Sequence, residues 1–171
     1  MGAYAILGLG NRIESDEALG ALVVEQLNAE PGLLAGLPDP GAVDLIDGGT
    51  VGLALIPHLM DLDGLVVVDV INAGAEPGTL IDLDGSALMR KEQQLMSVHD
   101  LGAGELLGAL FLIDAWPRRV RVVGLEPKAI ELGTELTPEV AAGVPGLIGT
   151  VVDYLDAWQQ EDAAAAVAAV A

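Results

Sequence analysis

The chain of 171 residues contains no cysteine, and this absence excludes several classes of protein. There can be no disulfide-stapled scaffold, no cysteine nucleophile and no thiolate metal ligand from this chain. Aromatic residues make up only 3% of the sequence, so a stacking platform for single-stranded nucleic acid is not expected. Any metal site in the protein is therefore expected to use oxygen and nitrogen donors.

Positive charge is scarce as well. Seven Lys and Arg residues stand against 26 Asp and Glu residues, which gives a formal net charge of −19. Such a chain has no basic face for nucleic-acid phosphates, and an anionic membrane surface would repel it. No run approaches the ~20 consecutive apolar residues of a membrane span, and the N-terminus lacks the pattern of a secretory signal. We therefore expect a cytoplasmic protein that binds neither nucleic acid nor membranes.

What the chain has is aliphatic residues, in segments that alternate between strand-like and helix-like patterns. Buried strands are predicted at Tyr4–Leu9, Val43–Ile46, Leu65–Val70 and Arg119–Leu125, with helical patterns following them. Thr79–Leu83 alternates apolar and acidic residues, which is typical of an edge strand. Strands joined through helices predict an α/β fold, with a mainly parallel sheet and helices on both faces.

No linker divides the sequence, so residues 1–160 are predicted to form a single domain. Residues 161–171 are rich in alanine and contain no capping residues. We expect this tail to be disordered and its removal after Gln160 to leave folding and activity intact.

In parallel sheets the functional site lies beyond the carboxyl ends of the strands, which here points to the loops after Leu9, Ile46 and Val68. The first of these loops begins Gly8-Leu9-Gly10, which invites a dinucleotide-binding interpretation. The third glycine of that fingerprint is replaced by Ile13, and no acidic residue follows at the distance needed to bind a ribose. A tight turn out of a strand is the better interpretation, and nucleotide binding remains a weak alternative.

Three other side chains belong to the predicted carboxyl edge of the sheet. Glu17 lies in the first turn of the first predicted helix, Asp69 ends the central strand, and His99 precedes a later helix. Taken singly, each has a plain structural explanation: dipole compensation, hydrogen bonding to loop amides, or helix capping. Taken together, two carboxylates and one imidazole form an oxygen and nitrogen donor set that suits nickel, zinc, manganese or iron. The other histidine, His58, is expected at the surface of a helix.

With these residues identified, the chain resembles the nickel–iron hydrogenase maturation endopeptidases over about Tyr4 to Trp158. The matching segments are Gly8–Asn11, Ser15–Gly20, Asp47–Thr50, Val67–Val70, Ser97–Gly102, Gly124–Pro127 and Leu136–Glu139. No single segment is distinctive, but their order and spacing together are specific. The resemblance implies a three-layer α/β/α sandwich around a twisted five-stranded sheet, in agreement with the fold predicted from periodicity.

The resemblance also implies an activity. Members of this family remove the C-terminal extension of the hydrogenase large-subunit precursor once nickel is in place. The family's nickel-binding residues fall on Glu17, Asp69 and His99, which would also carry catalysis. The nickel would arrive already held by the precursor, and zinc or cadmium could occupy the same ligands. Which carboxylate acts as general base stays open.

Two further questions stay open at this level. Asp47, Gly48, Gly49 and Thr50 are either a docking loop for the precursor's C-terminal peptide or a strand-to-helix turn with Thr50 as a cap. The protein is either an endopeptidase or a non-hydrolytic nickel-sensing or chaperone module that binds the same large subunit.

Overall fold

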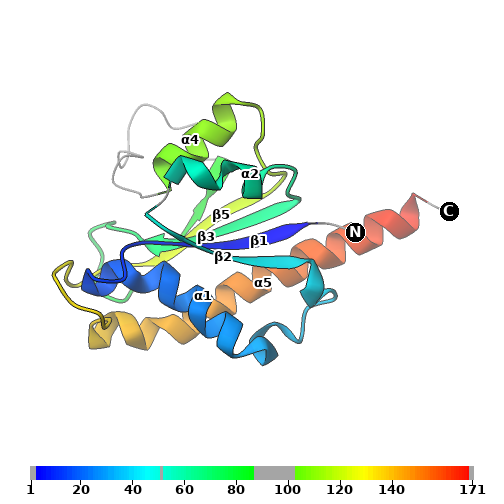
Figure 1. Ribbon diagram of the computed structural model, residues 1–171. Helices are drawn as coiled ribbons and strands as arrows, with labels where there is room; N and C mark the ends of the chain where they lie inside the picture. Colours follow the sequence, from blue (N-terminus) through cyan, green and yellow to red (C-terminus); the bar gives the residue numbers. More distant parts are fainter. Residues whose placement is uncertain (1–2, 51, 87–102, 170–171) are drawn as a thin grey trace.

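A computed structural model describes residues 3–50, 52–86 and 103–169 of the chain. Its centre is a sheet of five strands in the order β2-β1-β3-β5-β4 (Figure 1). The strands are β1 (Tyr4–Leu9), β2 (Val43–Gly49), β3 (Gly64–Val70), β4 (Leu80–Asp84) and β5 (Val120–Leu125). Strands β2, β1, β3 and β5 are mutually parallel, and β4 pairs with β5 in the antiparallel sense. The predicted five-stranded, mainly parallel sheet with an antiparallel edge strand is confirmed.

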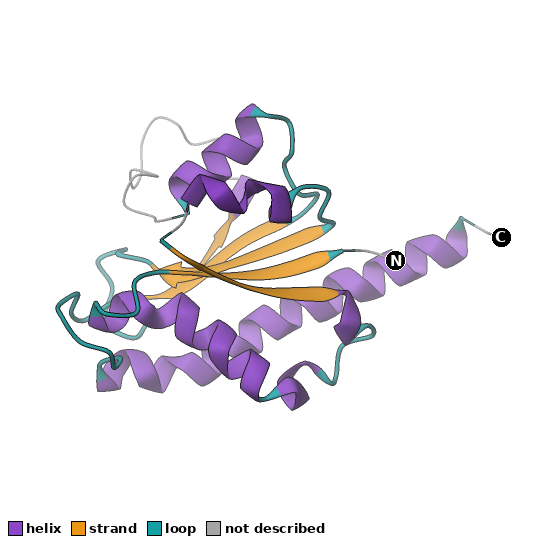
Figure 2. Ribbon diagram, viewed as in Figure 1, coloured by secondary structure: helices purple, strands orange, loops and turns teal. Residues whose placement is uncertain are grey.

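Helices cover both faces of the sheet, which completes the predicted three layers (Figure 2). Helices α1 (Leu19–Ala29) and α5 (Pro138–Ala168) lie on one face, and α2 (Ile56–Leu59) and α4 (Gly104–Leu112) lie on the other. Alternate residues of a strand point to opposite faces of the sheet, and each face has its own hydrophobic core. Ile6 packs on the α1 and α5 side, while Leu7 packs on the α2 and α4 side. Because β3 is buried on both faces, all seven of its residues are buried, as its apolar sequence predicts.

Short 3₁₀ helices lie beside or between several of the longer elements. They are η1 (Ser15–Ala18), η2 (Pro31–Leu34), η3 (Pro40–Ala42) and η4 (Gly52–Leu55). The helical pattern that follows β2 forms η4 and then α2, and Pro57 lies in the first turn of α2, where its missing N–H costs nothing. His58 is exposed on α2, as expected.

The C-terminus differs from the sequence-based expectation. Helix α5 continues to Ala168, through most of the segment for which we expected disorder. One reason is that alanine has the highest intrinsic helix propensity. A second reason is Asp162, which accepts a hydrogen bond from the Tyr4 hydroxyl at 2.5 Å and pairs with both Arg118 and Arg119. Burial and this hydrogen bond raise the pKa of Tyr4 to about 12.

By length and composition alone, α5 is also the one helix among the described residues that could cross a membrane. This is weak evidence, because a core helix of a water-soluble protein meets the same criteria. The buried residues of α5, from Val140 to Trp158, belong to the core between the helix and the sheet. The expectation that the protein binds no membrane stays a prediction.

Because of the ion pairs of Asp162, truncation of the tail is expected to lower the stability of the protein. Removal of residues 161–171 deletes Asp162 and leaves Arg118 and Arg119 without this partner, so the free energy of unfolding should fall by about 1–2 kcal/mol. Truncation after Ala165 keeps Asp162 and should leave stability within about 0.5 kcal/mol of the full chain. Urea denaturation of the three proteins checks this, and equal stability of all three would show that the Asp162 contacts contribute nothing.

Candidate active site at the carboxyl edge of the sheet

Glycines allow the first helical turns, η1 and the start of α1, to pack closely against the carboxyl ends of β1 and β3. A Cβ atom on Gly20 would lie 2.3 Å from the Leu9 carbonyl oxygen and 2.4 Å from that of Val68. A Cβ atom on Gly10 would lie 1.7 Å from the carbonyl oxygen of Glu17, and Gly10 has a φ of +125°. Only glycine fits such contacts. The η1–α1 segment therefore sits directly over the ends of β1 and β3, and it brings Glu17 to that edge.

Glu17 is half-buried beside a second acid. No described residue donates a hydrogen bond to its carboxylate. Burial raises the pKa of Glu17, and the nearby charge of Glu14 raises it further. A cation brought to this carboxylate would relieve both penalties, because it would compensate the partly desolvated negative charge.

Asp16, the neighbour of Glu17, has a different role. It is fully buried, and its carboxylate accepts hydrogen bonds from the backbone N–H groups of Lys128, Ala129 and Thr137 at 2.9, 3.0 and 2.7 Å. The Thr137 hydroxyl donates a fourth bond at 3.0 Å. Burial by itself would raise the pKa of Asp16, but these hydrogen bonds outweigh it and lower the pKa below its usual value. We refer to these four bonds as the Asp16 clamp.

The end of the central strand carries Asp69, with 2% of its surface exposed. The N–H of Val70 donates to Asp69 Oδ1 at 2.8 Å, which orients the side chain. On the neighbouring strand end, buried Glu126 accepts hydrogen bonds from the N–H groups of Ala73 and Gly74 at 2.7 and 3.2 Å. Glu126 therefore holds the loop that follows β3. Glu126 belongs to the family segment Gly124–Pro127, but the sequence alone does not predict a role for it.

The segment Asp47–Thr50 is joined to the first loop by ionic and backbone contacts. Arg12 Nη2 lies 2.8 Å from Asp47 Oδ2, and Arg12 Nη1 lies 2.5 Å from Glu25 Oε2. Asp47 Oδ1 accepts the N–H of Gly49 at 3.1 Å, and the Gly49 carbonyl accepts the N–H of Gly10 at 3.0 Å. Gly49 has a φ of +48° and open space where a side chain would be. The segment thus presents bare backbone at the same edge as Glu17.

His99 lies outside the described residues, so the structure places two of the three predicted metal ligands. Within residues 3–50, 52–86 and 103–169 there is no group of three or more His, Cys, Asp and Glu side chains arranged to hold a metal ion. The donor types nevertheless fit nickel, because carboxylate oxygens and an imidazole nitrogen are ordinary ligands for a borderline divalent ion. The half-buried Glu17 carboxylate, with no hydrogen-bond donor among the described residues, is suited to such a role.

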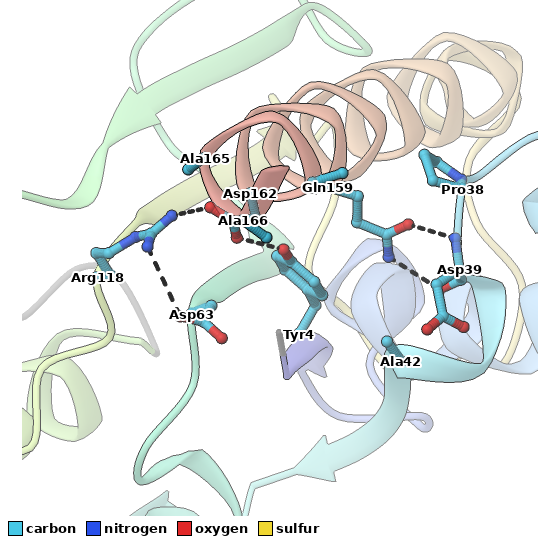
Figure 3. A pocket seen from close by; sticks show the side chains of 11 residues that line it. Tyr4, Pro38, Asp39, Ala42, Asp63, Arg118, Gln159, Asp162, Ala165 and Ala166 are labelled. Carbon is cyan, nitrogen blue, oxygen red and sulfur yellow. Dashed lines mark hydrogen bonds and ion pairs between the residues drawn. The ribbon is translucent and has the colours of Figure 1, made fainter. Parts of the chain in front are cut away.

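A cavity of about 510 Å³ lies at the opposite edge of the sheet, near the amino ends of the strands (Figure 3). Tyr4, Asp63 and Arg118 line one side of it, where Asp162 accepts bonds from Tyr4 and Arg118. On the other side the Gln159 amide is bonded to the backbone N–H and carbonyl of Asp39 at 2.8 and 2.9 Å. These contacts join α5 to the sheet and to the loop before β2, and none of the predicted site residues lines the cavity.

The Asp16 clamp yields a prediction for stability. Asp16→Asn removes the charge and places an amide group among N–H donors, so the free energy of unfolding should fall by about 2–4 kcal/mol at neutral pH. Because the folded-state pKa of Asp16 is lowered, its contribution is present above the unfolded value of 3.8 and is lost as the pH falls through the folded pKa. The difference in stability between the two proteins, measured by denaturation at each pH, should therefore shrink as the pH is lowered below 3.8. A difference that stays constant with pH would contradict the role of the charge.

The comparison with protein families gives one match over most of the chain. A family model described as hydrogenase maturation protease matches residues 23–154. Among curated proteins, the hydrogenase expression/formation protein HupD of Rhodobacter capsulatus is 36% identical over 157 residues, which cover 90% of this chain and 71% of HupD. The hydrogenase 2 maturation protease of Escherichia coli is 32% identical over 151 residues and is matched over 88% of both chains.

Solved structures agree with this match. The hydrogenase maturating endopeptidase HybD from E. coli superposes with a TM-score of 0.75 at 31% sequence identity, covering 90% of this chain and 91% of HybD. A hydrogenase maturation protease, HybD from Thermococcus kodakarensis, superposes with a TM-score of 0.69 at 27% identity, covering 90% and 99% of the two chains. The fold and the sequence therefore point to the same group of proteins.

Proposed function

This chain belongs to the hydrogenase maturation protease family, and we propose that it removes the C-terminal extension of a hydrogenase large-subunit precursor after nickel has been inserted. The observation that carries the proposal is the position of Glu17. Glycine contacts hold this half-buried carboxylate at the carboxyl edge of the sheet, beside the end of the strand that carries Asp69. We further propose that the protein acts in the cytoplasm, as expected from the sequence.

The proposed metal ligands are Glu17, Asp69 and His99, and the nickel is part of the substrate. Three such ligands without a thiolate would hold a free ion only modestly, so they are suited to complete the coordination of an ion that the precursor already binds. Bound nickel supplies Lewis-acid polarisation of a carbonyl group or a water molecule. Asp69 is oriented by its bond from the Val70 N–H, while Glu17 is held by the backbone of η1. Cleavage then reports that nickel has been inserted.

The segment Asp47–Thr50 is proposed to dock the peptide that precedes or follows the scissile bond. Its support is the bare backbone at Gly49, which lets another chain approach closely, and its hydrogen bond to Gly10. Arg12 would act here as a positioning residue, since it pairs with both Asp47 and Glu25.

The proposal is tested by cleavage of purified precursor in nickel-loaded and nickel-free forms. The wild-type protein should remove a C-terminal peptide only from the nickel-loaded form, as measured by mass spectrometry. Glu17→Gln and His99→Ala should each lower the cleavage rate by about 100-fold or more, because each removes one of only three proposed ligands. Circular dichroism should show that both variants are folded.

Matched controls are available in the same chain. His58→Ala removes the other histidine, which is exposed on α2, and Glu105→Gln removes an exposed acid from the first turn of α4. Both controls should cleave like the wild type. Equal cleavage of nickel-free precursor would overturn the nickel requirement. An intact precursor after binding to the wild-type protein would instead support a chaperone that does not cut.

A glycine substitution tests the docking segment. Gly49→Ala costs the strain of a positive φ, about 1 kcal/mol, but its methyl group meets nothing within the protein. The variant should therefore fold, yet its KM for precursor should rise if a peptide packs against this backbone. Gly36→Ala, at a second open position remote from the site, is the control. Unchanged KM for Gly49→Ala would remove this segment from the docking surface.

A further inference from the structure

Three large apolar side chains are exposed on the two loops beside Glu17. Leu132 is 87% exposed, and Ile13 and Ile130 are each 55% exposed. Scattered exposed apolar residues are normal, but these three come from loops that are joined by backbone hydrogen bonds. We name this set, Ile13, Ile130 and Leu132, the apolar edge surface.

The backbone beneath the apolar edge surface is held in place. The Gly133 N–H donates to the Ile13 carbonyl at 3.0 Å, and the Gly133 carbonyl accepts the N–H of Ser15 at 2.9 Å. The Ser15 hydroxyl donates to the Glu131 carbonyl at 2.9 Å, and the Asp16 clamp fixes the start of the same loop. A partner that contacts these side chains therefore has little backbone to order, which lowers the entropic cost of binding.

Acidic residues border this surface. Glu131 and Glu135 are exposed and Glu14 is half-buried, and none of the three forms an ion pair with another described residue. Among the described residues, the two cations near this surface are already engaged, since Lys128 pairs with Glu139, and Arg12 pairs with Glu25 and Asp47. The field that the described residues produce here is therefore negative, and it complements a partner with basic residues around an apolar centre.

We propose that the apolar edge surface binds the folded body of the large-subunit precursor next to its C-terminal extension. This inference rests on the proposed function, because it requires that the scissile bond reaches Glu17. The two parts are continuous: the N–H of Glu17 donates to the Glu14 carbonyl, and Glu14 is bridged to Gly133. A protein cut at Glu17 therefore has to lie against the loops that carry Ile13 and Leu132. The contacted precursor surface is apolar and ringed by Lys and Arg.

The test is the double variant Ile13→Ser/Leu132→Ser on a nickel-loaded precursor that the wild type cleaves. Both side chains are mostly exposed, so the folded state should lose little stability. The Kd for precursor and the KM should rise by about 10-fold or more, while kcat stays within about 2-fold of the wild-type value. The matched control is Leu112→Ser/Ile113→Ser, at the end of α4, where the two side chains are 84% and 53% exposed. This control should behave like the wild type.

The outcomes separate the two proposals. If the wild type binds precursor without cutting it, the protease proposal fails, while the Kd values still report on the surface. If the wild type cuts and the double variant keeps the wild-type Kd and KM, or if the control pair is impaired equally, the surface proposal is wrong. A second measurement is salt dependence: Glu131→Gln/Glu135→Gln should weaken the fall of kcat/KM with rising salt. An unchanged salt dependence would contradict the basic character inferred for the partner.

Discussion

The carboxylate of Asp16 is the interaction on which the candidate site depends. Its four hydrogen bonds join the turn after β1 to residues 128–137, which are more than a hundred positions away in the sequence. A charged group buried at this depth is tolerated only because N–H and O–H donors surround it. Loss of those bonds would free both loops that flank Glu17. Asp16, the residue next to the proposed ligand Glu17, is thus structural.

The carboxyl edge of the sheet gathers acidic side chains of two kinds. The carboxylates of Asp16 and Glu126 accept hydrogen bonds from backbone N–H groups, and these bonds hold the loops that follow β5 and β3. Glu17 has no such donors among the described residues, and partial burial raises the pKa of its carboxylate. This contrast, rather than acidity alone, is what separates a ligand candidate from a structural acid. Asp69 is buried, and the N–H of Val70 is among the groups that orient its carboxylate.

Much of the fold follows from local patterns, and the remainder follows from contacts that no local pattern encodes. The apolar run at β3 predicts a central strand, because a strand buried on both faces has apolar side chains throughout. The alternation of apolar and acidic residues at β4 predicts an edge strand with one face exposed. Ser15 shows the limit: it looks like a helix cap, yet its hydroxyl donates to the Glu131 carbonyl 116 positions away. The C-terminal segment is a second example, since its helical structure is supported by the hydrogen bond from Tyr4 to Asp162, which no local pattern predicts. Glu17 and Asp69 are predicted as site residues from their places in a first helical turn and at a strand end, and these roles stay predictions. The partners of Asp16 and Glu126 become visible only in the three-dimensional structure.

The bond between Tyr4 and Asp162 also bears on how the protein is made. The two residues are separated by 158 positions, so Tyr4 can meet this partner only after the intervening chain has been made. Helix α5 packs over β3 and β5 and must be largely translated before that face of the sheet is covered (Figure 1). Contacts of such long sequence separation slow folding, because the entropy of a long loop is lost before the contact forms. The part of the sheet that α5 covers therefore stays exposed until α5 has been made, and the hydrogen bonds between Asp16 and residues 128–137 form only after β5 has been made.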